Sequence, residues 1–245
     1  MRRNIEVMGT VATVEIAGPV ADADRLIEAV FDWLREVDAR FSTYRPDSEV
    51  NRLDRGEILP EECSADLRHV LERCTELWQE SGGYFDTYAT GRFDPSGYVK
   101  GWSVQRASEL LSASGAGNHL VDVGGDIQTR GRPAPHARWE IGIRHPLDRS
   151  KVCWVLAGTD LAVATSGTYE RGYHVVNPLT GTLAKQLCSV TVVGRDLGTT
   201  DGYATAALAM GLPGALTWLA GLDGYESGVV TADGEAYASD RLPVR

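Results

Sequence analysis

The sequence has no long hydrophobic run. No apolar stretch approaches the roughly 18 residues that a membrane-spanning helix needs. Glu6 interrupts the N-terminus before any apolar segment of signal-peptide length, and no lipobox is visible. We therefore predict a cytoplasmic protein without membrane insertion.

Cysteine is scarce, and basic residues are not clustered. The four cysteines show neither a Cys-x-x-Cys pair nor Cys/His spacing, which argues against a zinc site and favours buried thiols over disulfides. Lys and Arg number 24 against 34 Asp and Glu, so the net charge is -10. Without a basic cluster on this acidic chain we predict no nucleic-acid partner, and an anionic ligand needs positive charge supplied locally.

What is present is an ordinary globular composition, with 43% hydrophobic and 24% charged residues over 245 positions. Internal repeats, low-complexity segments and linkers are all missing. We therefore predict one domain that covers residues 1–245.

Hydrophobic periodicity predicts helices and strands that do not alternate regularly. Helical spacing covers residues 26–41, 66–79, 102–111, 200–210 and 213–220. Alternation or short apolar runs predict a strand or hairpin at 5–16, strands at 119–123, 139–144, 153–157, 161–164 and 189–193, and a closing hairpin at 228–231 and 235–238. This order is typical of an α+β fold with mixed or antiparallel sheets and packed helices, rather than a doubly wound sheet.

The residues after strand 161–164 are the most informative part of the chain. Thr165, Ser166 and Gly167 are small and polar, and His174 follows before an Asn-Pro turn. Hydroxyls, backbone N-H groups and an imidazole in one loop suit a polar ligand. Taken alone, the same residues are also ordinary turn residues with a structural histidine.

Two glycine-containing turns are further candidates. Gly82 and Gly83 precede Tyr84, Phe85 and Asp86, where the backbone can approach a ligand closely; a simple helix stop is the alternative. Near the start of the third helix, free N-H groups beside Lys100 would attract phosphate, and Trp102 offers a stacking face. A turn with a solvated lysine explains those residues equally well.

Asp201 and Thr205 are four residues apart, hence on one face of a helix. A carboxylate and a hydroxyl directed to one point suit a hard cation such as Mg2+. Asp201 in a first helical turn is also explained by the helix dipole alone. The Gly-Gly-Asp turn that ends at Asp126 is predicted to be structural, with its backbone packed closely beneath a ligand.

Taken in order, nine short motifs resemble the ApbE family, the FAD:protein FMN transferases. The motifs are Met8-Gly-Thr10, Phe41-Ser-Thr-Tyr44, Gly82-Gly-Tyr-Phe-Asp86, Ser96-Gly-Tyr-Val-Lys100-Gly, Asn118 to Asp126, Ala164-Thr-Ser-Gly167, His174-Val-Val-Asn-Pro178, Ser189-Val-Thr-Val192 and Asp201-Gly-Tyr-Ala-Thr205-Ala. Each motif is weak, but their shared order covers nearly the whole chain.

The resemblance implies a reaction and a site. Enzymes of this family split FAD with the help of Mg2+, release AMP and attach FMN through a phosphoester to a Thr or Ser hydroxyl of an acceptor protein. Family likeness assigns the metal to Asp201, Thr205 and the main-chain carbonyl of Val99. It assigns FAD contacts to Met8, Tyr44, Tyr84, Phe85, Asp86, Ser96, Lys100, Trp102, Thr165, Ser166 and His174.

His174 is our candidate general base for the acceptor hydroxyl, because a near-neutral pKa suits that role. The implied fold is one compact domain with FAD in a cleft between two lobes. The resemblance leaves the oligomeric state open, and we predict a monomer or homodimer. Two departures from the family stand out: Val99 replaces the usual Ala, and Phe85 and Lys100 are only 15 positions apart, which marks a short form. An FAD pyrophosphatase that uses water and a non-catalytic FAD-binding protein remain alternatives.

Overall fold

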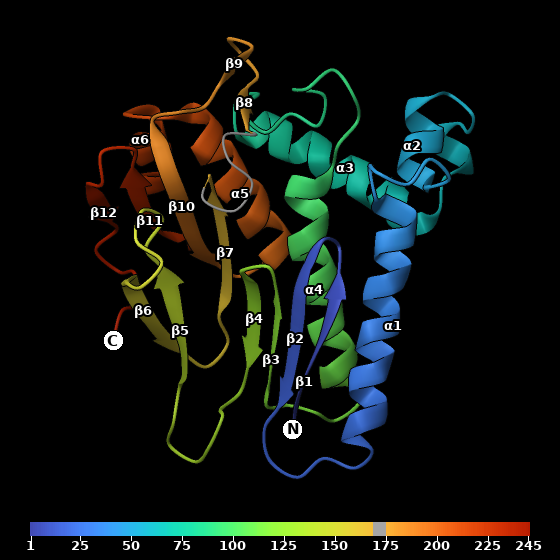
Figure 1. Cartoon of the computed structure of the whole chain (residues 1–245), viewed down its shortest axis with the longest axis vertical. Helices are drawn as coiled ribbons and strands as arrows, with labels where there is room; N and C mark the ends of the chain where they lie inside the picture. The colour runs from blue at the N-terminus through green and yellow to red at the C-terminus, as the bar shows by residue number, and fades with distance from the viewer. Residues whose placement is uncertain (169–174) are drawn as a thin grey trace.

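Strands from both ends of the chain belong to one eight-stranded antiparallel sheet, in which β1 and β12 are the edge strands (Figure 1). The computed structural model describes residues 1–168 and 175–245. The strand order is β1-β2-β3-β4-β7-β10-β11-β12. The strands are β1 (Arg2–Val7), β2 (Thr10–Ile16), β3 (His119–Val123), β4 (Asp126–Arg130), β7 (Ala162–Gly167), β10 (Leu187–Gly194), β11 (Glu226–Thr231) and β12 (Ala236–Ala238).

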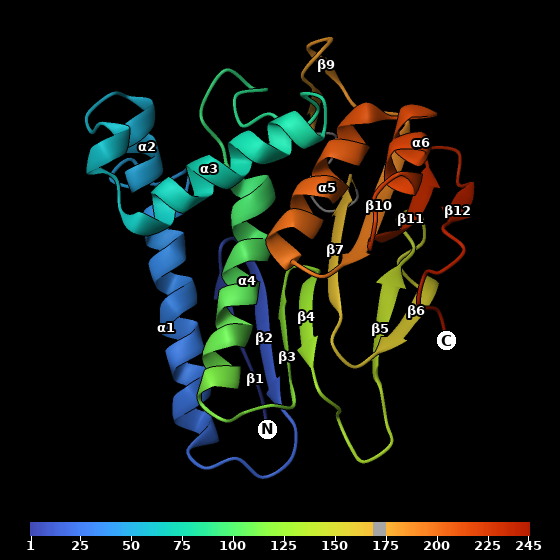
Figure 2. The same ribbon diagram turned by 180° about the vertical axis from the view of Figure 1, so that it is seen from behind.

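Helices cover one face of this sheet (Figure 2). They are α1 (Ala23–Phe41), α4 (Ser96–Ala113), α5 (Leu197–Met210) and α6 (Gly214–Ala220), while α3 (Ala65–Glu80) crosses their upper end and α2 (Glu49–Asp54) follows α1. The predicted α+β class with an antiparallel sheet is confirmed. In the part of the chain that the structure describes, no helix combines the length and apolarity needed to cross a bilayer.

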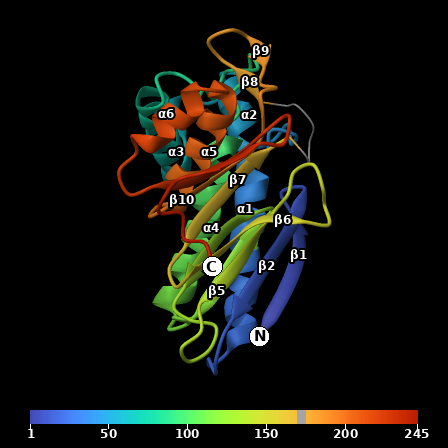
Figure 3. The same ribbon diagram turned by 90° about the vertical axis from the view of Figure 1, so that its left-hand side faces the viewer.

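A hairpin covers part of the opposite face (Figure 3). It consists of β5 (Trp139–Arg144) and β6 (Val152–Gly158), and it packs its apolar residues on Val163 of β7 and Val193 of β10. A second small hairpin, β8 (Val176–Asn177) with β9 (Thr182–Leu183), lies at the upper end of the molecule. Side chains of β7 therefore alternate between the helices and the β5–β6 hairpin.

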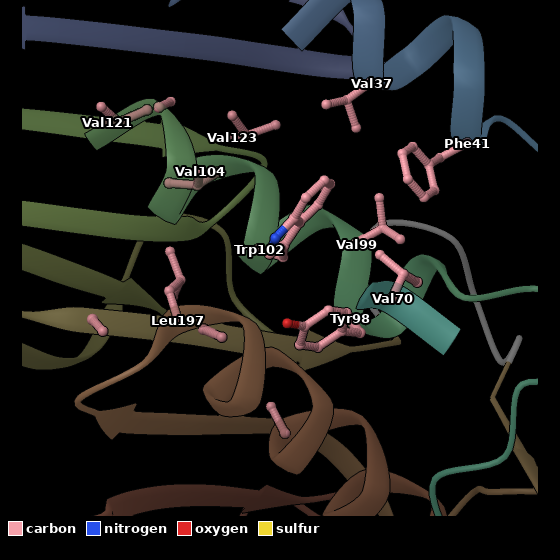
Figure 4. Packing of buried hydrophobic residues seen from close by; sticks show 14 of the residues in the cluster. Val37, Phe41, Val70, Tyr98, Val99, Trp102, Val104, Val121, Val123 and Leu197 are labelled. Carbon is pink, nitrogen blue, oxygen red and sulfur yellow. The ribbon is translucent and has the colours of Figure 1, made fainter. Parts of the chain in front are cut away.

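The helices α4 and α5 touch through glycines. A Cβ on Gly101 would lie 2.4 Å from the carbonyl oxygen of Leu197, and a Cβ on Gly198 would lie 2.7 Å from the Tyr98 ring. Figure 4 shows Tyr98 and Leu197 within the apolar layer at this crossing. Because neither glycine has a side chain, the backbones of α4 and α5 approach closely, and residues next to Gly101 and Gly198 contact the facing helix.

The start of α4 differs from the prediction. The helix begins at Ser96 rather than after Gly101, so Lys100 lies in its second turn and not beside its first N-H groups. Asp94 accepts a hydrogen bond from the Ser96 N-H at 3.0 Å, and Pro95 is the N-cap residue. Because Pro and Gly are typical of loop turns, the sequence pattern did not predict the first helical turn of α4.

Strand β7 also extends further than predicted. Thr165 to Gly167 were expected in a loop, but they pair with β10 in register, Thr165 opposite Thr191 and Gly167 opposite Ser189. Small polar residues favour turns locally, and only the neighbouring strand makes these residues extended. The strands β4, β8 and β9 and the helix α2 were not predicted.

The α4–α5 crossing can be tested with Gly101→Ala. The added methyl would overlap backbone atoms of Leu197 that cannot move away independently, so we expect a loss of about 1–3 kcal/mol or more in the free energy of unfolding, measured with urea. Gly117→Ala is the matched control, since a Cβ there meets nothing within 4 Å. Equal unfolding midpoints for the two variants would contradict the close crossing.

Candidate functional site

Two tight turns lie side by side at one end of the sheet. Met8 and Gly9 connect β1 to β2 with φ of 55° and 68°, and Gly124 and Gly125 connect β3 to β4 with φ of 59° and 94°. The Thr10 hydroxyl oxygen lies 2.9 Å from the position of a Cβ on Gly124. Positive φ at both central residues is typical of a type I′ hairpin turn, and at Met8 it costs about 1 kcal/mol. Met8 therefore occupies a conformation that the turn imposes.

A lysine and two buried carboxylates meet next to these turns. Asp126 of β4 is 0% exposed and Asp201 of α5 is 2% exposed. The Lys100 ammonium contacts Oδ2 of Asp126 and lies 3.9 Å from Oδ2 of Asp201. The same Asp201 oxygen accepts a hydrogen bond from the Gly101 N-H at 3.0 Å. The α4–α5 crossing thus positions the Asp201 carboxylate directly.

These three side chains carry one positive and two negative formal charges. Oδ1 of Asp126 is buried and has no hydrogen-bond partner within the described residues. Burial raises the pKa of Asp201 well above its usual range, and the neighbouring Asp126 raises it further, while Lys100 and the Gly101 N-H oppose the shift. The cluster therefore favours either a proton or a bound cation.

Thr205 lies one turn of α5 after Asp201 and faces the same elements. Its hydroxyl oxygen is 3.1 Å from the Ser166 hydroxyl oxygen of β7. A Cβ on Gly97 of α4 would lie 3.1 Å from the Thr205 hydroxyl oxygen and 3.3 Å from the Phe85 ring. The structure therefore brings together five predicted residues, Phe85, Lys100, Ser166, Asp201 and Thr205.

Two main-chain carbonyl groups of α4 can be compared as candidate metal ligands, the predicted one of Val99 and that of Gly97. The Val99 side chain is buried, between Phe41 and Val70 (Figure 4). In a regular helix the N-H of residue 101 bonds to the carbonyl of residue 97, and here the Gly101 N-H donates to Asp201. Gly97 is the α4 residue that approaches Thr205, so its carbonyl is the stronger candidate, and the Val99 carbonyl stays a prediction.

The oxygen atoms in this site fit a hard divalent cation. Asp201 and Thr205 offer a carboxylate and a hydroxyl oxygen, and Asp126 beside them adds a second buried carboxylate, one oxygen of which has no hydrogen-bond partner within the described residues. Across residues 1–168 and 175–245, no three His, Cys, Asp or Glu side chains form a metal cage. Mg2+ is commonly held by one or two carboxylates and completed by substrate phosphates, so this donor set suits it.

Thr165 is not brought to this centre. Its hydroxyl oxygen lies 2.9 Å from that of Thr191. It shares a face of β7 with Val163, which packs under the β5–β6 hairpin, whereas Ser166 faces α5. A strand presents neighbouring side chains to opposite faces, which a loop prediction could not anticipate.

Trp102 lies in the hydrophobic core. It is 5% exposed, and its ring packs edge-to-face on Trp33 and Phe41, with centroids 5.5 Å apart in each pair. Packing accounts for this residue completely, so its placement does not support stacking on a flavin or adenine ring. Tyr44, by contrast, is 91% exposed in the loop after α1, and Tyr84 is partly buried.

Two more predicted residues, Asp86 and Ser96, lie just before α4 or at its start. Ser96 is exposed at the first position of the helix. Asp86 accepts a hydrogen bond from the Tyr88 N-H at 2.7 Å, which fixes a local turn. His174 lies outside the described residues.

Sequence reasoning missed two residues of the site. Asp126 was predicted to be structural, yet it is the carboxylate in contact with Lys100. Gly97 was not singled out, although it allows α4 to approach Thr205. The charged residue within the Gly-Gly-Asp turn was the available signal for Asp126; Gly97 had none, because its role depends on a distant helix.

Known proteins resemble this chain in sequence. A sequence model of the ApbE family matches residues 8–92 and 87–229. The FAD:protein FMN transferase of Vibrio cholerae is 25% identical over 265 residues, which cover 83% of this chain and 79% of that protein. The enzyme of the same name from Haemophilus influenzae is 24% identical, covering 80% of this chain and 75% of that protein.

Solved structures share the fold. Flavin transferase ApbE from Vibrio cholerae superposes with a TM-score of 0.85 at 23% identity, covering 100% of this chain and 99% of that chain. The ApbE protein from Thermotoga maritima gives a TM-score of 0.88 at 19% identity, with 100% and 99% coverage. At these identities the structural likeness establishes the fold.

The raised pKa of Asp201 predicts a pH-dependent stability. Its folded pKa lies above the unfolded value near 3.8, so the folded protein binds the extra proton and this contribution to stability is lost as pH rises through the folded pKa. Metal-free Asp201→Asn should therefore be more stable than the wild type at neutral pH, and the gap should shrink toward pH 4. Urea midpoints in EDTA across this range measure it. Asp240→Asn, at an exposed position, is the control. An identical pH-dependent difference in stability between Asp240→Asn and the wild type would refute the raised pKa of Asp201.

Proposed function

The chain belongs to the ApbE family, and on this premise we propose that it transfers FMN from FAD to a Thr or Ser hydroxyl of an acceptor protein and releases AMP. The observation that carries the proposal is the cluster of Lys100, Asp126 and Asp201 beside Thr205. An ammonium and oxygen ligands for a cation at one site suit a pyrophosphate. The names of the curated relatives support the same reaction.

The proposed reaction exchanges one phosphorus–oxygen bond for another. The acceptor hydroxyl oxygen bonds to the phosphorus of the FMN half of FAD. The bond from that phosphorus to the bridging oxygen breaks, and the bridging oxygen leaves with its electron pair as part of AMP. His174 accepts the hydroxyl proton in this proposal, since an imidazole with a near-neutral pKa suits a general base.

Asp201 and Thr205 are the proposed side-chain ligands of Mg2+, with a main-chain carbonyl of α4 at Gly97 or Val99. When bound, the cation neutralises charge on the pyrophosphate. The Lys100 ammonium, next to Asp126 and Asp201, would contact phosphate oxygens in this proposal. The short contact between Ser166 and Thr205 then orients the Thr205 hydroxyl within the site.

The proposed FAD contacts divide into two groups. Phe85 and Ser166 lie around Thr205 and would contact the phosphates or the adjacent part of FAD. Family likeness adds a second group, Met8, Tyr44, Tyr84, Asp86 and Ser96, around a cleft between two lobes. We leave Trp102 and Thr165 out of this set, because each is accounted for by packing or pairing elsewhere. A cytoplasmic location and a monomer or homodimer remain predictions.

The function is tested by incubating the protein with FAD, Mg2+ and candidate acceptor proteins. We expect the acceptor mass to rise by one FMN with equimolar AMP. Asp201→Asn should lower AMP release by roughly a hundredfold or more, because the cation loses its carboxylate ligand. Asp240→Asn is the control. Free FMN with AMP would indicate a pyrophosphatase instead, and intact FAD would indicate binding alone; either result with every acceptor contradicts the proposal.

His174→Ala tests the proposed base. We expect transfer to slow by about 10²–10⁴-fold, while FAD affinity, measured by fluorescence quenching, stays close to that of the wild type. His136→Asn, an exposed histidine in the loop before β5, is the control variant. Full flavinylation by His174→Ala would remove His174 from the mechanism.

A further inference from the structure

Lys100 lies between two buried carboxylates but does not contact them equally. Its ammonium is in direct contact with Asp126, while Asp201 is 3.9 Å away. The two carboxylates come from different elements, Asp126 from β4 and Asp201 from α5, and both are fully or almost fully buried. The ammonium is therefore held on the sheet side of the site.

Packing alone gives no reason for a carboxylate at Asp126. A buried charge is costly even when it is paired, and one oxygen of Asp126 is left without a hydrogen-bond partner within the described residues. The second carboxylate of the same turn, that of the half-buried Asp122, accepts the Gly125 N-H at 2.9 Å and thereby stabilises the turn itself. Asp126 has no such local hydrogen bond, and its partners are groups across the site, the Lys100 ammonium and the Asp201 carboxyl group.

We propose that Asp126 is a positioning residue of the transfer site, which holds the Lys100 ammonium against β4 so that the Asp201 carboxylate stays available to a divalent cation. The proposal rests on the proposed function, because it assigns the cation to Asp201. If residue 126 is neutral, Lys100 keeps the Asp201 carboxylate, 3.9 Å away, as an anionic neighbour. The ammonium then pairs with Asp201 and competes with the cation for the same oxygen atoms.

The experiment measures cation binding directly. The full-length protein is first treated with EDTA to remove metal and is then titrated with Mn2+, and electron paramagnetic resonance gives the concentration of free Mn2+. Asp126→Asn keeps the shape of the side chain and removes its charge. We expect its Mn2+ dissociation constant to rise at least roughly tenfold, which is typical when a residue that supports a metal ligand is lost. Asp122→Asn is the matched control and should stay within about twofold of the wild type. Unchanged affinity in Asp126→Asn overturns the proposal.

A double-mutant cycle separates positioning from direct coordination. If Asp126 acts through Lys100, adding Asp126→Asn to Lys100→Met should cause no further loss of Mn2+ affinity. A full tenfold loss on the Lys100→Met background overturns the proposal, because it would make Asp126 a ligand in its own right. Urea unfolding of each variant checks that the fold is retained.

Lys100→Gln gives a test that does not depend on folding of the Asp126 variant. Removing the competing ammonium should leave Mn2+ affinity equal to or higher than that of the wild type, and a tenfold loss overturns the proposal. Failure of the proposed function has a different signature. Suppose that the wild type binds Mn2+, that Asp126→Asn binds it more weakly, and that the wild type modifies no acceptor. This result supports the positioning role of Asp126 and contradicts the transferase activity.

Discussion

The close contact of α4 with α5 is the constraint on which the site depends. Gly101 and Gly198 allow the two backbones to approach, and the Gly101 N-H then reaches the Asp201 carboxylate. Further along the same pair, Gly97 lets α4 approach Thr205. Side chains at these glycines would separate the helices and move the oxygen atoms apart. The geometry of the candidate metal site is therefore set by helix packing rather than by a loop.

The electrostatics of the site oppose the stability of the ligand-free protein. Two carboxylates share one ammonium inside the molecule, and burial raises the pKa of Asp201. A hydrophobic residue in place of either carboxylate would make the ligand-free protein more stable. A cation and an anionic pyrophosphate, however, complement this arrangement. The cluster carries one surplus negative charge, which a bound cation would offset in the proposed function.

Much of the fold follows from local patterns. The amphipathic spacing of α1 and α3 and the alternation in β1, β2 and β3 predict these elements within a few residues. Prediction was wrong where polar or turn-forming residues enter an element. Ser96 and Gly97 begin α4 although they resemble a turn, and Thr165 to Gly167 extend β7 because β10 lies beside them. In each case a distant neighbour overrides the local preference.

The sequence by itself determined the class of fold, the family and the pairing of Asp201 with Thr205, because helical spacing and motif order are properties of the chain. Only the tertiary structure decided which other residues join that pair. It brought Asp126 and Ser166 to the same centre, placed the Thr165 hydroxyl beside that of Thr191 and buried the Trp102 ring against Trp33 and Phe41. The reason is that strand pairing and helix crossing set which face each side chain occupies, and both depend on contacts between residues far apart in the chain.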